Sequence, residues 1–128
     1  MAVPVKFRGQ LGKGAIVTRG LDHCLFVFTE IEWRALAKKL VALPLVQANS
    51  RAFARLMLAG AMEAALDSQG RSLLPDYLRR YAGLNKQAVV AGVYNRIEIW
   101  EEGAWQQYKA KTEDNSDEIA EKLSELGI

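Results

Sequence analysis

The chain has little cysteine, little proline and almost no net charge. Its 128 residues include one cysteine and three prolines, and the formal charge is +2. The single thiol, Cys24, can form neither an internal disulfide nor a multi-cysteine zinc site. No apolar run approaches the roughly 20 residues that span a bilayer, and the N-terminal segment lacks the pattern of a secretory signal. We therefore expect a cytoplasmic protein with no membrane segment.

The remaining composition is typical of a folded domain. Half of the residues are hydrophobic, 25% are charged and 9% are aromatic. A chain of this length buries roughly two-thirds of the surface that its unfolded form exposes. One compact unit, or two small repeated halves, is therefore expected.

Charge is distributed unevenly along the chain. Residues 1–96 hold 14 Lys and Arg against 6 Asp and Glu, whereas residues 97–128 hold 3 against 9. A basic body suits a polyanionic partner, because Lys and Arg contacts to phosphate supply most of the nonspecific affinity for nucleic acid. The basic residues are scattered, however, so charge alone favours an ordinary soluble surface that ends in an acidic helix.

The sequence contains an internal duplication. Residues 15–33 (AIVTRGLDHCLFVFTEIEW) align with residues 88–105 (AVVAGVYNRIEIWEEGAW), and Pro4 is matched by Pro75. Each copy predicts a short helix after a proline, two strands joined by a turn, and then an amphipathic helix. Matched pairs are Gly20 and Gly92, Leu25 and Ile97, Val27 and Ile99, Phe28 and Trp100, and Trp33 and Trp105.

Local signals predict where the helices begin. Thr29 and Glu32 form a capping box, with Phe28 and Trp33 placed as the hydrophobic staple of the helix that follows. In the second copy the equivalent tryptophan pair keeps this spacing, although Glu101 is expected to be a weaker cap than Thr29.

Two further helices are predicted. The apolar side chains of residues 53–57 give one helix between the copies, with Asn49 or Ser50 as its N-cap and Gly60 as its stop. A last helix starts near Asn115 and has one apolar side, formed by Ile119, Leu123 and Leu126.

These elements divide the chain into four segments. Residues 1–49 form the first repeat, 50–60 a connecting helix, 61–112 the second repeat, and 113–128 an acidic amphipathic helix. Before Pro75 lie 14 residues that predict two short strands around a turn, whereas only 3 precede Pro4. The first repeat therefore lacks its N-terminal hairpin. We infer that the sequence as given begins late, and a naturally shortened variant is the alternative.

The turn of that hairpin, residues 67–70 (DSQG), is the strongest candidate for a functional site. Asp67 can accept hydrogen bonds from its own turn, Gly70 supplies the positive φ that a tight turn needs, and Arg71 then projects from the hairpin. Taken alone, this is a common hairpin with a structural role. Its position between a strand and a proline-started helix makes it specific.

Other candidate sites are weaker. His23 and Cys24 are adjacent, so on a strand their side chains point to opposite faces and suit neither a shared metal nor a catalytic pair. We expect a surface histidine and a half-buried thiol instead. The glycine-rich residues 9–14 lack the spacing of a phosphate-binding loop. No carboxylate pair or metal-ligand cluster is evident, so we expect neither enzymatic activity nor a metal or other cofactor.

With the repeat and the hairpin together, the chain resembles the MraZ family of bacterial transcriptional regulators. The resemblance is carried by residues 54–84 (ARLMLAGAMEAALDSQGRSLLPDYLRRYAGL), 89–105 (VVAGVYNRIEIWEEGAW) and 19–28 (RGLDHCLFVF), and it extends over essentially the entire chain. It implies an α+β fold of two AbrB-like swapped-hairpin, or double-split, β-barrel repeats with flanking helices. It also implies a nucleoid-associated homo-oligomeric ring, an octamer or larger, that binds promoter repeats in double-stranded DNA and represses the division and cell wall gene cluster.

The resemblance also implies roles for single residues. The family's DNA-contacting signature, an Asp followed four residues later by Arg, is matched by Asp67 and Arg71, and the first copy's signature falls in the missing stretch. Arg71 would contact phosphate or a guanine edge, and only the guanine contact gives sequence preference. Asp67 and Gly70 would position the turn, and Gln69 at its tip would read a base. Flanking candidates for phosphate contacts are Lys6, Arg8, Arg79 and Arg80.

Two hypotheses from different classes follow. The first is an oligomeric DNA-binding regulator in which many weak hairpins act together. The alternative is a ring-forming protein-interaction scaffold that binds no DNA in this shortened form and recruits a partner through its acidic C-terminal helix.

Overall fold

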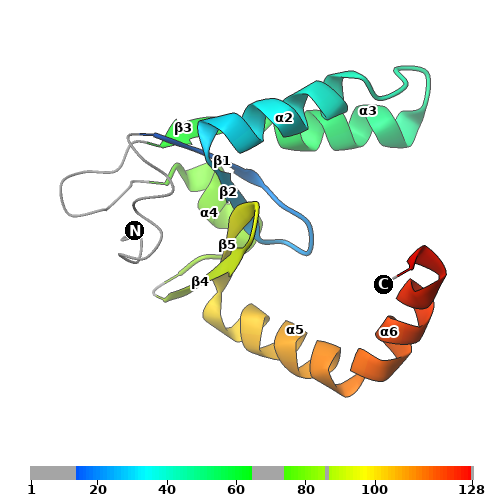
Figure 1. The fold of residues 1–128 in the computed structure, drawn as a ribbon. Coiled ribbons are helices and arrows are strands. Elements are labelled where there is room, and N and C mark those ends of the chain that lie inside the picture. Colours follow the sequence, from blue (N-terminus) through cyan, green and yellow to red (C-terminus); the bar gives the residue numbers. More distant parts are fainter. Residues whose placement is uncertain (1–13, 65–73, 86, 128) are drawn as a thin grey trace.

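A computed structural model describes residues 14–64, 74–85 and 87–127. The strands within these ranges form one antiparallel sheet in the order β3-β1-β2-β5-β4, with helices on both faces (Figure 1). The strands are β1 (Ala15–Arg19), β2 (Leu25–Phe28), β3 (Met62–Ala64), β4 (Ala88–Val93) and β5 (Arg96–Glu101). The helical segments are α2 (Glu30–Val41), α3 (Ala48–Ala54), the π-helical turn η1 (Arg55–Ala59), α4 (Asp76–Ala82), α5 (Glu102–Asp114), α6 (Ser116–Leu123) and the 3-10 turn η2 (Ser124–Leu126).

The two halves of the chain meet at the centre of the sheet, where β2 pairs with β5. The register there is Leu25–Ile99, Phe26–Glu98 and Val27–Ile97. In the duplication Leu25 corresponds to Ile97, and Val27 corresponds to Ile99. Leu25 therefore pairs with the counterpart of Val27, and Val27 pairs with the counterpart of Leu25. A pseudo-twofold axis therefore passes between Phe26 and Glu98. The hairpins β1–β2 and β4–β5 lie on its two sides.

A strand of the second half also crosses to the first. β3 pairs with the outer edge of β1, with Ala64 opposite Ala15 and Met62 opposite Val17. The two repeats are thus interlaced, as a swapped hairpin requires. The predicted α+β fold with two repeats is confirmed, as are the strands of the second copy and the turn at Tyr94 and Asn95 that joins them.

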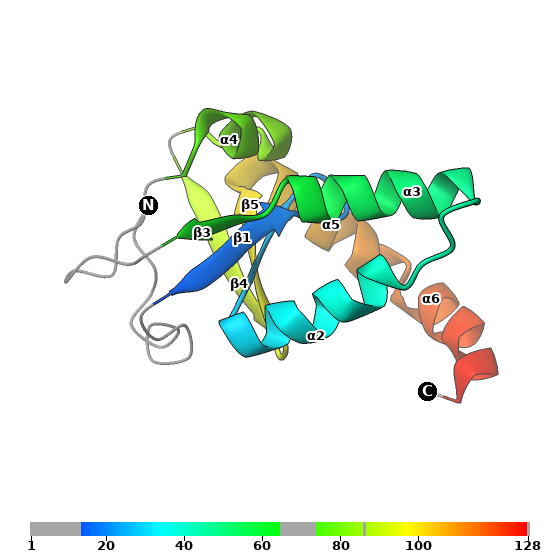
Figure 2. The ribbon, with the colours of Figure 1, turned by 90° about the horizontal axis from the view of Figure 1, so that it is seen from above.

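The sheet separates two apolar cores because side chains alternate between its faces. One face packs against α4, which inserts Leu78 and Ala82 among Val17, Leu25 and Ile97. The other face holds Phe26, Phe28 and Trp100 under α2, η1 and the start of α5. Figure 2 shows α4 and α2 on opposite sides of the sheet.

The predicted starts of α2 and α5 are correct, and one cap is better than expected. The Thr29 hydroxyl accepts a hydrogen bond from the Glu32 N–H at 3.2 Å, and the ring centroids of Phe28 and Trp33 lie 5.8 Å apart. The prediction that Glu101 caps weakly is wrong. Its carboxylate accepts from two backbone N–H groups at the start of α5, because its longer side chain folds back over the first turn.

The predicted caps of α3 are also wrong. The helix begins at Ala48 with Gln47 as its N-cap, so Asn49 and Ser50 lie in its first turn. The reason is a backbone turn closed by the Gln47 N–H and the Pro44 carbonyl at 3.2 Å, which leads directly into the helix. Gly60 ends the segment as predicted.

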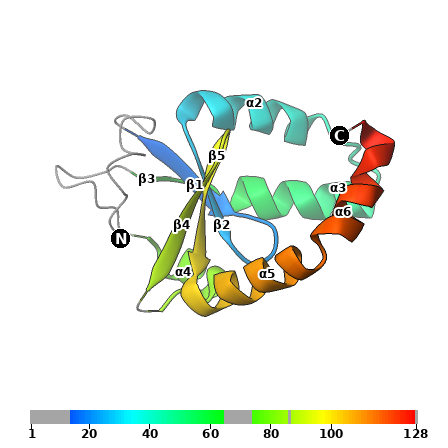
Figure 3. The ribbon, with the colours of Figure 1, turned by 60° about the horizontal axis from the view of Figure 1, so that its bottom comes forward.

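The helices that follow the two hairpins form two arms. We call α2–α3, with the loop 42–47, the first arm, and α5–α6, with η2, the second arm. Both project to the same side of the sheet (Figures 1 and 3). The last helix starts after Asn115 as predicted. None of the described helices has the length and apolar character needed to cross a membrane.

Cys24 is fully buried at the end of the β1–β2 turn, so the expectation of a half-buried thiol is wrong. Its Sγ donates to the Leu21 carbonyl at 3.1 Å. The tight turn, in which Asp22 and His23 both have positive φ, tucks the thiol inward. Burial, with Glu98 and Asp22 adding to it, raises the pKa of Cys24 to about 12.

A thiol with this pKa stays protonated at neutral pH and reacts slowly. We expect Ellman's reagent at pH 8 to label Cys24 at least about tenfold more slowly in the native protein than in urea, where a cysteine pKa near 8.5 applies. Equal labelling rates in the two states would contradict the burial of this thiol.

A side-chain hydrogen bond from Thr18 connects β1 to η1. Its buried hydroxyl donates to the Met57 carbonyl at 2.6 Å. Thr18→Val keeps the shape of the side chain but leaves that carbonyl without its donor, so the free energy of unfolding should fall by about 1–3 kcal/mol. Urea denaturation measures the loss. Thr112→Val, at an exposed position of α5, is the matched control and should change stability little.

Candidate nucleic-acid interface

Most of the predicted DNA-contacting residues fall on segments that the structure does not describe. Residues 65–73 contain Asp67, Gln69, Gly70 and Arg71, and residues 1–13 contain Lys6 and Arg8. The structure describes the elements on both sides of the 65–73 segment, which begins after β3 and ends where Leu74 and Pro75 lead into α4.

Both ends of this segment are held by the fold. On one side Ala64 pairs with Ala15 at the edge of the sheet. On the other side Leu74 and Leu78 are buried in the core that α4 forms with the sheet. The described residues on both sides of positions 65–73 are therefore fixed in the fold.

Helix α4 is fixed at both ends. Pro75 serves as N-cap, with the φ of −67° that its ring imposes. At the other end Gly83 has a φ of +64°, and the Leu84 N–H reaches back to the Arg79 carbonyl at 2.9 Å. This is a Schellman motif, which needs a residue that tolerates left-handed backbone.

Two tyrosines tie α4 to the loops around it. The Tyr77 hydroxyl donates to the Gly60 carbonyl at 2.9 Å, and the Tyr81 hydroxyl donates to the Gly20 carbonyl at 2.6 Å. The Arg19 guanidinium lies 5.7 Å from the centre of the Tyr77 ring. Arg19 was not among the predicted site residues, because nothing in its sequence context distinguishes it from other strand residues.

Arg79 and Arg80 are exposed on the outer side of α4. Arg79 forms an ion pair with Asp76, one turn earlier in the helix. The hydrogen bond from Arg79 holds the pKa of Asp76 below its usual range. The carboxylate thus competes with any phosphate for the Arg79 guanidinium.

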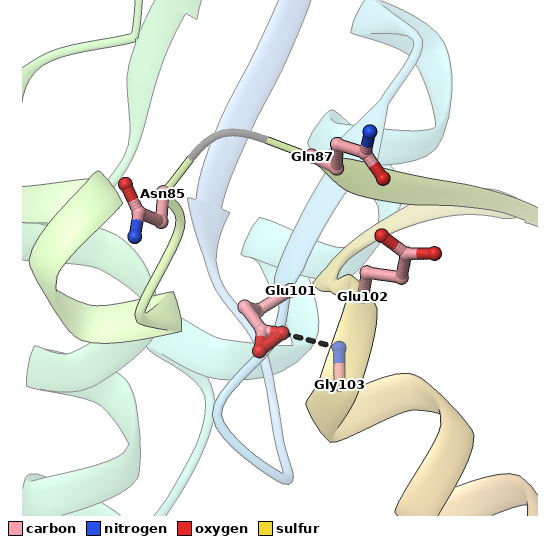
Figure 4. A pocket seen from close by; sticks show the side chains of 5 residues that line it. All are labelled: Asn85, Gln87, Glu101, Glu102 and Gly103. Carbon is pink, nitrogen blue, oxygen red and sulfur yellow. Dashed lines mark hydrogen bonds between the residues drawn. The ribbon is translucent and has the colours of Figure 1, made fainter.

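The basic surface is bounded by an acidic one. Arg79, Arg80 and Asn85 line one hollow. Asn85 also lines the next hollow, where Figure 4 shows Glu101 bonded to the Gly103 N–H and Glu102 beside it. The described lining of this second hollow is therefore acidic, whereas Arg79 and Arg80 line the first hollow together with Asp76. Asn85 was not among the residues predicted from the sequence to line this surface, although polar residues after a helix-ending glycine are often exposed.

His23 and Cys24, the weaker sequence candidates, line neither of these two hollows. His23 is exposed, as predicted, and its ring lies 5.4 Å from that of Tyr81. In the described part of the chain, no three His, Cys, Asp or Glu side chains are grouped so as to hold a metal ion.

Comparison with known proteins identifies the same family in both halves. The family model described as "MraZ protein, putative antitoxin-like" matches residues 1–56 and again residues 57–126. The chain is also similar to three proteins, each named "Transcriptional regulator MraZ". The one from Desulfitobacterium hafniense (strain DSM 10664 / DCB-2) is 50% identical over 128 residues, covering 100% of this chain and 90% of the relative. Those from Carboxydothermus hydrogenoformans and Thermoanaerobacter pseudethanolicus are 49% and 46% identical, covering 94% and 98% of this chain and 85% and 88% of the relatives.

Proposed function

Because the chain belongs to the MraZ family, we propose that it is a transcriptional regulator that binds double-stranded DNA through the hairpin between β3 and α4. The supporting observation is the anchoring of the residues that flank positions 65–73: Ala64 pairs at the sheet edge, and Leu74 is buried in the core. Fixed ends reduce the conformational entropy that a loop loses when it binds, which favours a contact residue such as Arg71.

The proposal gives separate roles to four residues of the segment 65–73 and to two arginines of α4. Arg71 binds a phosphate or forks onto a guanine edge, and Gln69 reads a neighbouring base. Asp67 and Gly70 shape the turn. Exposed arginines on α4 then supply sequence-independent contacts to phosphate, namely Arg79 and Arg80.

One hairpin of this size binds weakly, so the proposal includes an assembly. A homo-oligomeric ring, an octamer or larger, would present its hairpins at regular intervals to repeated promoter elements. Acting in the cytoplasm on the nucleoid, it would repress the division and cell wall gene cluster. Within each copy of the chain we propose four structural units, namely residues 1–49, 50–60, 61–112 and 113–128.

The exposed second arm favours a second candidate function, a protein-interaction scaffold. Residues 106–127 are exposed throughout, and their acidic part would suit a basic partner protein. Deleting residues 113–128 separates the two functions. A regulator keeps its hairpin contact with DNA, whereas a scaffold loses its partner.

Arg71→Ala is expected to weaken binding to DNA from upstream of the protein's own gene by about tenfold or more, because one guanidinium contact contributes roughly 1–3 kcal/mol. Fluorescence anisotropy at several salt concentrations measures both the affinity and its salt dependence. Arg71→Lys keeps the charge but not the planar fork. It should therefore retain nonspecific binding and lose preference for the upstream DNA.

The control for this experiment is Arg34→Ala, which removes an exposed arginine paired with Glu30 on α2. It should leave the affinity for DNA unchanged. Full affinity of a folded Arg71→Ala protein with wild-type oligomeric mass would refute the role of the hairpin.

The double variant Arg79→Gln with Arg80→Gln should weaken binding to the upstream DNA and to unrelated DNA by similar factors, since phosphate contacts carry no sequence information. Asp76→Asn provides the opposite change. It releases Arg79 from its ion pair and should tighten binding to both DNAs. If neither variant alters affinity for either DNA, α4 does not face the duplex.

A further inference from the structure

A hollow of about 600 Å³ lies between the β1–β2 turn and the second arm. The turn contributes Asp22 and His23, and the arm contributes residues of α5 and α6 from both sides of Asn115, where the two helices meet. Figure 1 shows the turn on the concave side of these helices. The hollow has the size of a site for a small molecule, since such sites enclose roughly 300–1,000 Å³.

The β1–β2 turn gives this hollow a fixed wall. Asp22 and His23 both have positive φ, and the Gly20 N–H closes the turn by donating to the Cys24 carbonyl at 2.8 Å. The His23 ring lies 5.4 Å from the ring of Tyr81, and the Tyr81 hydroxyl donates to the Gly20 carbonyl. A wall held in this way loses little conformational entropy when a ligand binds.

Lysines of the second arm gather around the hollow, although the end of this arm is acidic. Lys111 and Lys122 both line it. Residues 113–127 contain six Asp and Glu residues, and only Glu118 among them lines the hollow. Lys122 is the one cation of that segment. The hollow is therefore richer in positive charge than the rest of this segment.

The two carboxylates that line the hollow already have partners. The Tyr108 hydroxyl donates to Asp22, and the negative charge of Asp22 raises the pKa of that hydroxyl. Glu118 pairs with Lys122 at 3.8 Å, and both side chains are exposed, so this ion pair contributes little and Lys122 is available to a stronger acceptor. No ion pair between described residues engages Lys111. The binding capacity that remains is therefore for an anion.

We propose that this hollow binds a nucleoside monophosphate. The phosphate would contact the ammonium groups of Lys111 and Lys122, because charge-assisted contacts to phosphate are stronger than the exposed pair that Lys122 now makes. A phosphate group alone leaves most of the hollow empty, so the ligand carries an organic part. His23 and Tyr108 supply two aromatic rings on which a base can stack, and Ile119 adds an apolar contact.

This site does not rest on the proposed contact with DNA. It is formed by the β1–β2 turn and the second arm, whereas the proposed DNA contact uses residues 65–73 and the exposed arginines of α4. Stacking on an aromatic ring accepts any base, so the site should accept purine and pyrimidine nucleotides alike.

Isothermal titration of the full chain with AMP and with UMP tests the proposal. Both nucleotides should bind saturably, with one equivalent per chain. Adenosine lacks the phosphate and inorganic phosphate lacks the base, so each should bind at least about tenfold more weakly than AMP. The proposal is overturned if neither nucleotide binds saturably, or if adenosine or inorganic phosphate binds as tightly as AMP.

A pair of lysine variants locates the binding site. Lys111→Gln with Lys122→Gln removes both charges at exposed positions, so folding should be retained, and circular dichroism checks it. This variant should weaken AMP binding by about tenfold or more, because each charge-assisted contact to the phosphate is lost. Lys109→Gln is the matched control, since Lys109 is also exposed on α5 but does not line the hollow. Wild-type affinity in the folded double variant would overturn the site.

A last comparison distinguishes failure of this site from failure of the proposed function. Arg71→Ala should bind AMP with wild-type affinity, and the double lysine variant should bind the upstream DNA with wild-type affinity. If Arg71→Ala loses AMP binding while the lysine variant keeps it, the nucleotide occupies the proposed DNA contact and the hollow is the wrong site. If AMP binding depends on the lysines but no form of the protein binds DNA, only the proposed function is wrong.

Discussion

The antiparallel pairing of β2 with β5 is the contact on which the rest of the structure depends. It joins the two repeats at a pseudo-twofold axis where Phe26 faces Glu98. The buried carboxylate of Glu98 is satisfied by Arg96 at 2.9 Å and by the Trp100 indole N–H at 3.1 Å. The Arg96 guanidinium in turn lies 4.7 Å from the centre of the Phe26 ring. The polar cluster lies on β5, and its Arg96 guanidinium contacts β2 of the first copy through the Phe26 ring.

Everything with a proposed role is placed by this pairing. The hairpins β1–β2 and β4–β5 lie on either side of it, and β3 pairs with the outer edge of β1. Helix α4 closes the core on one face, and both arms leave from the strands at the axis. The segment 65–73, for which we propose DNA contact, and the two arms are therefore joined to different strands of the sheet, so each can be changed without the other.

The sequence was sufficient for features with local physical causes. Alternating apolar residues predicted the strands, and Thr29, Pro75 and Gly60 marked helix ends. Features that depend on tertiary contacts were missed. Glu101 caps α5 because its side chain has room to fold back, and Cys24 is fully buried because two residues with positive φ turn it inward. For the site, the basic residues of α4 were predicted from family resemblance, whereas Asn85 and Arg19 gained their positions only from the packing of α4.

In the proposed function residues 65–73 contact DNA, whereas the two arms do not. Hydrogen–deuterium exchange of the oligomer with and without upstream promoter DNA tests both parts in one measurement. DNA should slow exchange across residues 65–73 and the first turn of α4, and it should leave α6 unchanged. DNA-dependent protection confined to the second arm, with residues 65–73 unaffected, would contradict the account.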